Sequence, residues 1–336
     1  MLRAIASMMV VIYHITIKAG QYNNSAFQWV HIGQYGVDLF FIISGYIMCF
    51  TTSDKNIHFG EFLMLRIKRI IPLYWAMTTV ALIIYIIVPS LVNSSGGQTS
   101  IIASYTLIPN GQKLLVQNGW TLSYEFLFYI IFGLSLNFKK TGLLKFNVFV
   151  ISLMIFIGSI YKFQNVIILF LTDPILSEFL YGMLAYRMLS SYKTPIIICI
   201  ISLLIGIFLI IIQNQYGIFN TVLGRSLSGG VPMLFVFIGL VGMEKYIARV
   251  DGKLKSILLI LGNSSYSLYL IHPFVLSASA LVLKKLHLSS ISLIFGVTLL
   301  LSSVICGIIL FKYIENPINN MLKVRKLEKK PTTTTL

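Results

Sequence analysis

Long apolar runs separated by short polar segments dominate this chain. Two of the clearest runs cover residues 195–212 and 291–311. Runs of about 18 or more apolar residues are typical of membrane-spanning helices. The pattern predicts about ten such helices, starting near residues 4, 36, 73, 120, 146, 166, 195, 229, 257 and 289. The predicted fold class is therefore all-α, a polytopic transmembrane helical bundle.

Composition and charge agree with this interpretation. Hydrophobic residues make up 57% of the chain and charged residues only 11%, whereas soluble domains carry about 25% charged residues. A net charge of +16 in a soluble protein would suggest nucleic acid as a partner. Most lysines and arginines, however, fall on one side of the predicted spans if the N-terminus is cytoplasmic. We therefore predict two cytoplasmic termini, contact with membrane lipids and no nucleic-acid partner.

The pattern predicts a single transmembrane domain over residues 1–326 and a disordered cytoplasmic tail over residues 327–336. The connection over residues 89–119 is long enough to hold an interfacial or re-entrant piece. The three cysteines lie far apart in apolar segments, so they form neither a disulfide framework nor a metal-ligand pattern. No metal is expected. The first apolar segment has no convincing cleavage site and is interpreted as a retained helix.

Ionisable residues inside apolar segments are the informative ones, because each is costly within a bilayer. On the first helix Arg3, Ser7, His14 and Lys18 share one narrow stripe at about 100° per residue. Arg3 is expected at the inner surface and His14 about 16 Å deeper, near the middle of the bilayer. The alternative is a structural histidine, hydrogen-bonded within the bundle, with an arginine that extends to the interface.

Two acidic residues stand in the second and fourth predicted helices. Asp38 lies seven residues before Gly45 on one face, where a glycine lets a backbone or a ligand approach closely. Asp38 could also merely stabilise the helix N-terminus through the helix dipole. Glu125 lies about 7 Å deeper than the interfacial Trp120 and shares a face with Tyr129. A glutamate at that depth requires a partner or a proton.

Three cations, Arg66, Lys68 and Arg69, precede the predicted third helix at the inner surface. They could contact anionic lipid, or they could simply set the topology of the chain. Arginine is also suited to bidentate contacts with phosphate. The sequence leaves these alternatives open.

The ninth predicted helix carries a polar face formed by Ser265, Tyr269 and His272 at i, i+4 and i+7 spacing. Pro273 allows a kink that neighbouring groups can compensate within a membrane. His272 could cap the backbone that this proline frees, or it could take part in catalysis.

Six segments in this order resemble the membrane acyltransferase-3 family. They are LRAIA with His14 (from residue 2), GVDLFFIISG (36–45), RIKR with PLYW (66–75), WTLSYE with FY (120–129), SYSLY with HP (265–273) and YIENP (313–317). The resemblance covers residues 2 to about 318. The second and fourth segments look closest to the exopolysaccharide-modifying acetyltransferases of that family.

The resemblance implies an integral enzyme of the bacterial cytoplasmic (inner) membrane. Such enzymes transfer an acyl group, usually acetyl, from cytosolic acetyl-CoA to a hydroxyl of a surface glycan, such as lipopolysaccharide, or of its lipid-linked precursor. Acetyl-CoA is then a donor substrate, and no permanently bound cofactor is expected. In family members the arginine–histidine motif and the paired arginines are treated as essential, and here they correspond to Arg3, His14, Arg66 and Arg69. Members usually carry a few more residues before the first arginine, so a late start is expected.

These observations give one hypothesis for the site. The donor phosphates are held at the inner face by Arg3, Arg66, Arg69 and Lys68. The catalytic candidates are His14 as general base, worth about 10²–10⁴ in rate, with Glu125 and Asp38 nearer the outer face. The candidates on the acceptor side are Trp120, Ser123, Tyr129, Tyr269 and His272. The alternatives are a proton-coupled carrier that exports glycan precursors and a non-catalytic membrane scaffold.

Overall fold

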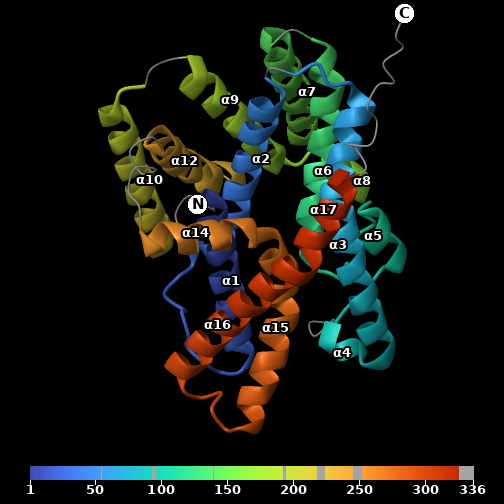
Figure 1. Cartoon of the computed structure of the whole chain (residues 1–336), viewed down its shortest axis with the longest axis vertical. Helices are drawn as coiled ribbons and strands as arrows, with labels where there is room; N and C mark the ends of the chain where they lie inside the picture. Colours follow the sequence, from blue (N-terminus) through green and yellow to red (C-terminus); the bar gives the residue numbers. More distant parts are fainter. Residues whose placement is uncertain are drawn as a thin grey trace, which may run out of the picture.

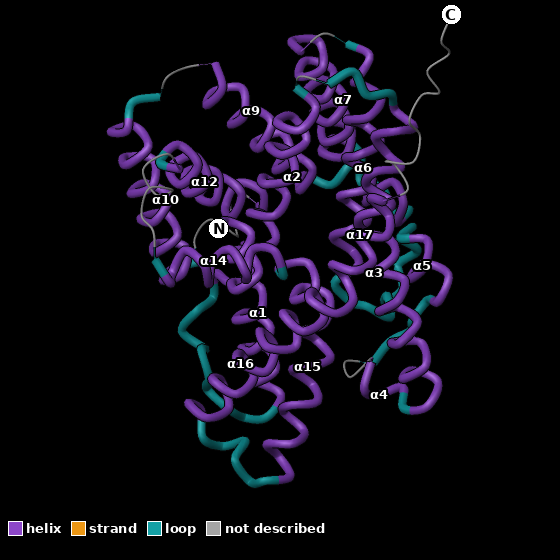
Figure 2. The backbone as a smooth tube through the Cα atoms, in the orientation of Figure 1, coloured by secondary structure: helices purple, strands orange, loops and turns teal. Residues whose placement is uncertain are grey.

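The computed structural model describes residues 1–53, 55–92, 96–138, 140–191, 194–217, 224–244 and 252–324. Over these ranges the structure consists of helices and their connections, with one isolated β-bridge between Thr99 and Lys113 and no strand (Figure 1). Figure 2 shows the same arrangement as helical tubes joined by loops. The all-α fold class is confirmed. The predicted boundary at residue 326 and the predicted tail lie outside the described residues.

Nine helical segments of the described chain are long and apolar enough to cross a membrane. They contain α1 (Leu2–Gln21), α2 (Gly36–Thr52), α3 (Phe59–Ile87), α6 (Gly119–Leu134), α7 (Lys140–Ile160), α8 (Val166–Leu171) with α9 (Ser177–Ser191), α10 (Ile196–Tyr216), α15 (Ser265–Lys285) and α16 (Ser292–Leu310). A shorter apolar helix, α12 (Val231–Gly242), follows a π-helical turn over Ser226–Gly230. The prediction of about ten apolar helices is therefore confirmed.

The predicted start of the third helix near residue 73 is wrong. Helix α3 begins at Phe59, because the segment before Pro72 contains good helix formers, and a proline within a membrane helix is tolerated. Arg66, Lys68 and Arg69 thus lie inside the helix and not before it. This places the two arginines roughly 10 and 15 Å along the helix axis from its first residue.

The segment predicted to start near residue 257 is divided in two. A short helix, α14 (Lys253–Asn263), precedes the apolar α15, and Ser264 lies between them. The backbone N–H and the hydroxyl of Ser264 both donate to the Ile260 carbonyl at 2.9 Å and so cap the end of α14. Figure 1 shows α14 lying across the bundle, in contrast to α15. The final helix, α17 (Asn316–Val324), follows α16 after a π-helical turn.

Helix α2 runs through the middle of the bundle and packs against α1, α9 and α12 (Figure 1). A Cβ atom added to Gly45 would lie 2.0 Å from the Phe179 carbonyl oxygen, and one added to Gly182 would lie 2.0 Å from that of Ile42. Each glycine therefore faces the backbone of the other helix. The close approach predicted at Gly45 is confirmed, and the group that approaches is the backbone of α9.

Helix α15 packs against both α1 and α16, and this contact positions the predicted site residues of the first and ninth segments. The long connection over residues 89–119 contains α4 (Pro89–Val92) and α5 (Ile101–Thr106). It packs onto α3 and α15. Leu115 and Val116 of this connection are fully buried. The connection is therefore part of the bundle's packing and not a free loop.

Candidate active site

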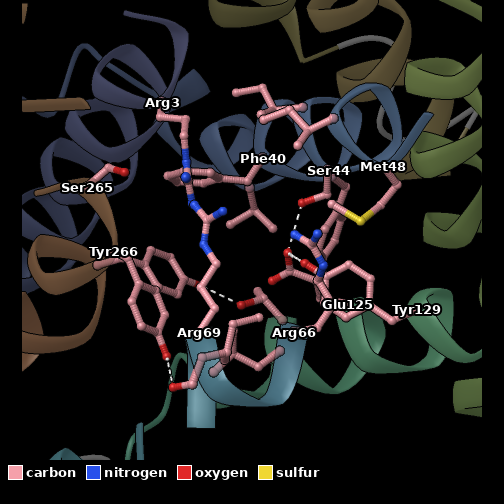
Figure 3. A pocket seen from close by; sticks show the side chains of 18 residues that line it. Arg3, Phe40, Ser44, Met48, Arg66, Arg69, Glu125, Tyr129, Ser265 and Tyr266 are labelled. Carbon is pink, nitrogen blue, oxygen red and sulfur yellow. Dashed lines mark hydrogen bonds between the residues drawn. The ribbon is translucent and has the colours of Figure 1, made fainter. Parts of the chain in front are cut away.

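The largest group of predicted site residues meets in one cavity, called here the arginine cavity. It has a volume of about 70 Å³ and is lined by residues of α1, α2, α3, α6 and α15. Its charged residues are Arg3, Arg66, Arg69 and Glu125. Figure 3 shows Arg3 and Arg69 extending toward each other from opposite sides of this space. With three cations and one carboxylate, the cavity is positively charged.

The hydrogen bonds in this cavity leave the arginines available. One carboxylate oxygen of Glu125 accepts from the Ser44 hydroxyl at 2.9 Å and also from the Tyr129 hydroxyl. Within the described residues none of the three arginines forms an ion pair. The Nε atoms of Arg3 and Arg66 are buried and have no hydrogen-bond partner in the part of the chain that the structure describes. Because buried donors are nearly always satisfied, the cavity is suited to an anionic ligand.

Glu125 lies with the arginines, whereas the sequence hypothesis placed it apart from them. The residue stands near the middle of the 16-residue helix α6, and Arg66 and Arg69 lie within α3 because that helix begins at Phe59. The nearby carboxylate partly offsets the mutual repulsion of the three guanidinium groups. Arg66 also lies over the Phe62 ring, 5.4 Å from its centroid, a cation–π contact.

His14 and His272 form the second part of the site. His14 Nδ1 lies 3.0 Å from His272 Nε2, and it also lies 3.0 Å from the Val10 carbonyl oxygen. His272 is fully buried, and its Nδ1 lies 3.1 Å from the Leu268 carbonyl oxygen. The contact between α1 and α15 thus joins two histidines that the sequence places far apart.

These contacts determine which ring nitrogen carries the proton in each neutral histidine. A carbonyl oxygen only accepts, so Nδ1 of both rings must be the donor to avoid two lone pairs facing each other. His14 Nδ1–H then also points to His272 Nε2, which accepts. We assign both rings as Nδ1–H tautomers on this hydrogen-bond pattern. The Nε2 atom of His14 is left with a free lone pair, as a general base requires.

His14 lines a different cavity, called here the histidine cavity. This cavity has a volume of about 210 Å³ and is lined by residues of α1, α4, α15 and the connection before α6. Tyr269 lines the arginine cavity, and its ring centroid lies 6.0 Å from that of His272. The His14 and His272 centroids are 4.9 Å apart. Tyr269, His272 and His14 therefore form a continuous row from one cavity to the other.

Asp38 lies apart from both cavities. It is fully buried and forms an ion pair with Arg225 at 3.0 Å. Glu178 is also fully buried, and its carboxyl group lies against that of Asp38. Sequence reasoning missed Arg225 and Glu178 as members of this cluster. An acid within the apolar segment of α9 was the available signal for Glu178.

Four of the predicted donor and acceptor residues line neither cavity, namely Lys68, Ser123, Trp120 and His272. Lys68 is exposed and does not line the arginine cavity, because it points away from the face that Arg66 and Arg69 share at i, i+3 spacing. Ser123 is buried and lines neither cavity.

The three aromatic candidates occupy different environments. Tyr129 and Tyr269 line the arginine cavity, on what was predicted to be the acceptor side. The Tyr269 hydroxyl lies 2.8 Å from that of Thr121. Trp120 lines neither cavity, and its ring lies 5.8 Å from the Arg225 guanidinium carbon.

Pro273 frees the carbonyl of Tyr269, because a proline has no N–H with which to complete the helix. The side-chain amide of Asn118 donates to that carbonyl at 2.8 Å. The His272 ring is also hydrogen-bonded to the backbone of Tyr269, so Asn118 contributes to the capping that the sequence suggested for His272 without excluding it. Among the described residues no group of three or more His, Cys, Asp or Glu is placed to hold a metal ion.

Comparison with known proteins identifies several relatives. The chain is 27% identical to the exopolysaccharide production protein ExoZ of Rhizobium meliloti, over 94% of the chain and 97% of that protein. It is 26% identical to a Staphylococcus aureus (strain COL) protein named "Putative O-acetyltransferase", over 82% of the chain but only 50% of that protein. Peptidoglycan O-acetyltransferase OatA of Listeria monocytogenes is 29% identical over 39% of the chain and 22% of its own length.

No solved structure matches the chain. A family model described as "Acyltransferase domain" matches residues 1–312. This match includes every helix that lines the two cavities and the first five of the six segments quoted above. With its set of membrane-length apolar helices, the chain therefore belongs to the acyltransferase-3 family of multi-pass membrane proteins.

Proposed function

We propose that this protein transfers an acetyl group from cytosolic acetyl-CoA to a hydroxyl of a surface or exported polysaccharide, or of its lipid-linked precursor. Its location in this proposal is the bacterial cytoplasmic membrane, with both termini cytoplasmic. The names of ExoZ and OatA support a polysaccharide acceptor and O-acetylation. The observation that carries the proposal is the arginine cavity, where three guanidinium groups with no ion-pair partner among the described residues lie with one carboxylate.

In the proposal the arginine cavity binds phosphate groups of the donor. A guanidinium group can bind a phosphate through two parallel hydrogen bonds. These hydrogen bonds are stronger in a site shielded from water, because the local dielectric is lower. Arg69 is exposed, so the cavity reaches the protein surface beside it. Glu125, held by hydrogen bonds from Ser44 and Tyr129, acts as a positioning residue. Its negative charge offsets the mutual repulsion of the three guanidinium groups while no donor is bound.

The acyl transfer takes place at His14. The acceptor hydroxyl oxygen attacks the thioester carbonyl carbon while His14 Nε2 takes the hydroxyl proton. The tetrahedral intermediate then collapses, the C–S bond breaks, and the leaving thiolate takes that proton from the imidazolium. The products are an O-acetyl ester and free coenzyme A. His272 is a positioning residue, because its Nε2 accepts from His14 Nδ1 and stabilises the imidazolium.

In the proposal the arginine cavity holds the phosphates of the donor and the histidine cavity holds its thioester. Arg3 and His14 lie eleven residues apart on α1, or about 16 Å along its axis. In acetyl-CoA the pantetheine arm separates the phosphates from the thioester, and in an extended donor this separation is similar to the distance between Arg3 and His14. The rings of His14, His272 and Tyr269 are packed between the two cavities, so in the proposal they move apart when this arm passes.

Donor binding is tested with the purified full-length protein in lipid nanodiscs. Thiol release from acetyl-CoA is measured in the presence of the cell's own exported polysaccharide, first deacetylated with mild base. A charge-assisted hydrogen bond is worth about 1.5–3 kcal/mol, so Arg66→Gln and Arg69→Gln each raise KM for acetyl-CoA about tenfold or more. Lys68→Gln is the matched control, since it removes a cation from the same helix outside the cavity.

An unchanged KM in both arginine variants, or an equal rise in Lys68→Gln, contradicts this assignment of the donor site. His14→Ala should lower the transfer rate by about 10²–10⁴ while the protein remains folded and inserted. Transfer at the wild-type rate in that variant removes His14 from the mechanism. Substrate movement driven by a pH gradient, without thiol release, supports the alternative of a carrier.

A further inference from the structure

We infer that the histidine cavity is the acceptor subsite and that Lys18 selects an acceptor carrying a negative charge. This inference rests on the proposed function and adds the chemical class of the acceptor to it. The anionic group is either a carboxylate of an acidic sugar or a phosphate ester carried by the glycan, and both present oxygen acceptors to an ammonium group.

The position of the cavity relative to His14 is the first observation. The cavity is lined by His14, Lys18 and Gln21, which follow i, i+4, i+7 spacing on one face of α1. Lys18 lies about 6 Å beyond His14 along the helix axis, on the side away from Arg3. This separation is on the scale of one sugar residue. A glycan whose hydroxyl reaches His14 therefore places its neighbouring substituents beside Lys18.

Lys18 lacks a partner, which is the second observation. The side chain is half-buried within the first membrane-length helix, where an ammonium group is costly unless it is paired. No described residue forms an ion pair or a hydrogen bond with it. Three of the other polar residues that line the cavity, Gln21, Gln117 and Ser277, are neutral. The cavity thus presents a cation without its anion.

The neutral groups of the cavity are suited to a sugar. Amide and hydroxyl side chains both donate and accept hydrogen bonds, as sugar hydroxyls do. No described residue forms a side-chain hydrogen bond with Gln21, Gln117 or Ser277. Phe274 and Leu276 supply an apolar wall for the faces of the ring. Gln21 and Gln117 are exposed, so the cavity opens at the end of α1 that is extracytoplasmic in the proposed topology.

Lys18 is unsuited to a role in donor binding. The arginine cavity already contains three cations for the donor phosphates, and Lys18 lies fifteen residues beyond Arg3 on α1, about 22 Å along its axis. Placing donor phosphates at Lys18 would also move the thioester away from His14. The charge at Lys18 therefore serves the second substrate.

The test uses three forms of one polymer with the full-length protein in nanodiscs. The probe is the exported polysaccharide of the cell that makes this protein, deacetylated with mild base. One portion is left native, in a second the carboxyl groups are reduced to alcohols, and in a third the phosphate esters are removed with hydrogen fluoride. Acetyl incorporation from labelled acetyl-CoA is measured for the wild type, Lys18→Gln and Lys18→Arg.

The wild type should acetylate the native polymer at least tenfold faster than one of the two modified forms. The modification that lowers the acetylation rate identifies the anion as a carboxylate or a phosphate. In Lys18→Gln this ratio falls to about one, and Lys18→Arg keeps it. Equal rates on all three polymers in the wild type, or a ratio that survives Lys18→Gln, overturn the inference. If no polymer accepts acetyl while acetyl-CoA binding depends on Arg66 and Arg69, the acceptor assignment fails and the donor site stands. If neither is observed, the proposed function fails as a whole.

Discussion

His272 offers a direct test of the arrangement around His14. In the structure its Nε2 accepts from His14 Nδ1 at 3.0 Å, and its own Nδ1 is anchored 3.1 Å from the Leu268 carbonyl oxygen. If His14 is the base, this bond fixes the ring with Nε2 toward the substrate. The bond also strengthens when His14 takes up a proton, because the donor then becomes charged. Replacing His272 with alanine removes both effects.

The size of the effect follows from this change in charge. A neutral hydrogen bond contributes about 0.5–1.5 kcal/mol and one to a charged group about 1.5–3 kcal/mol. Only the increase in the strength of this hydrogen bond between the ground state and the transition state changes the rate. That increase is about 1–2 kcal/mol. His272→Ala should therefore lower kcat about 5- to 30-fold. His14→Ala removes the base itself and should cost about 10²–10⁴.

The assay is acetyl transfer from labelled acetyl-CoA, with kcat and KM determined separately. His272→Gln should recover most of the rate, because its amide oxygen can accept from His14 while its NH₂ group donates to Leu268. Leu270→Ala is the matched control, since it truncates a fully buried residue of α15 that lines neither cavity. An unchanged kcat in His272→Ala refutes the positioning role. A loss as large as that of His14→Ala would make His272 itself the base.

Two further predictions concern stability and are read as the midpoint of thermal unfolding in detergent. Gly45→Ala places a methyl group 2.0 Å from the Phe179 carbonyl oxygen and should destabilise the protein by about 1–3 kcal/mol. Gly60→Ala, which meets nothing within 4 Å, should be neutral, and equal midpoints for the two variants would contradict this packing. Arg225→Gln removes the ion-pair partner of the buried Asp38 carboxylate. The free energy of unfolding should fall by about 1–3 kcal/mol. This loss is smaller than for a fully buried ion pair, because the Arg225 side chain is 38% exposed. Asp38→Asn in the same chain should restore part of the loss, and a midpoint unchanged by Arg225→Gln alone would show that the pair contributes nothing.

The positions of the apolar helices could be predicted from the sequence because membrane insertion depends on a local property. A run of about 20 apolar residues is long enough to cross a bilayer wherever it occurs in the chain. The same reasoning singled out His14, Asp38 and Glu125, since an ionisable group within such a run is unusual without neighbours that compensate it. The start of α3 was misplaced because the arginines there lowered the apparent hydropathy of a segment that is nevertheless helical.

How these residues combine was decided by the tertiary structure. Hydropathy gives the length of each helix but not the face that it turns toward its neighbours, and that choice depends on side-chain packing between distant segments. The crossing of α2 and α9 at two glycines, the contact of α1 with α15 and the early start of α3 together place Glu125 among the arginines and His14 against His272. They also leave Asp38 with Arg225, away from both cavities. The sequence by itself determined which side chains needed partners within the membrane, and only the packing of the helices determined which partner each one received.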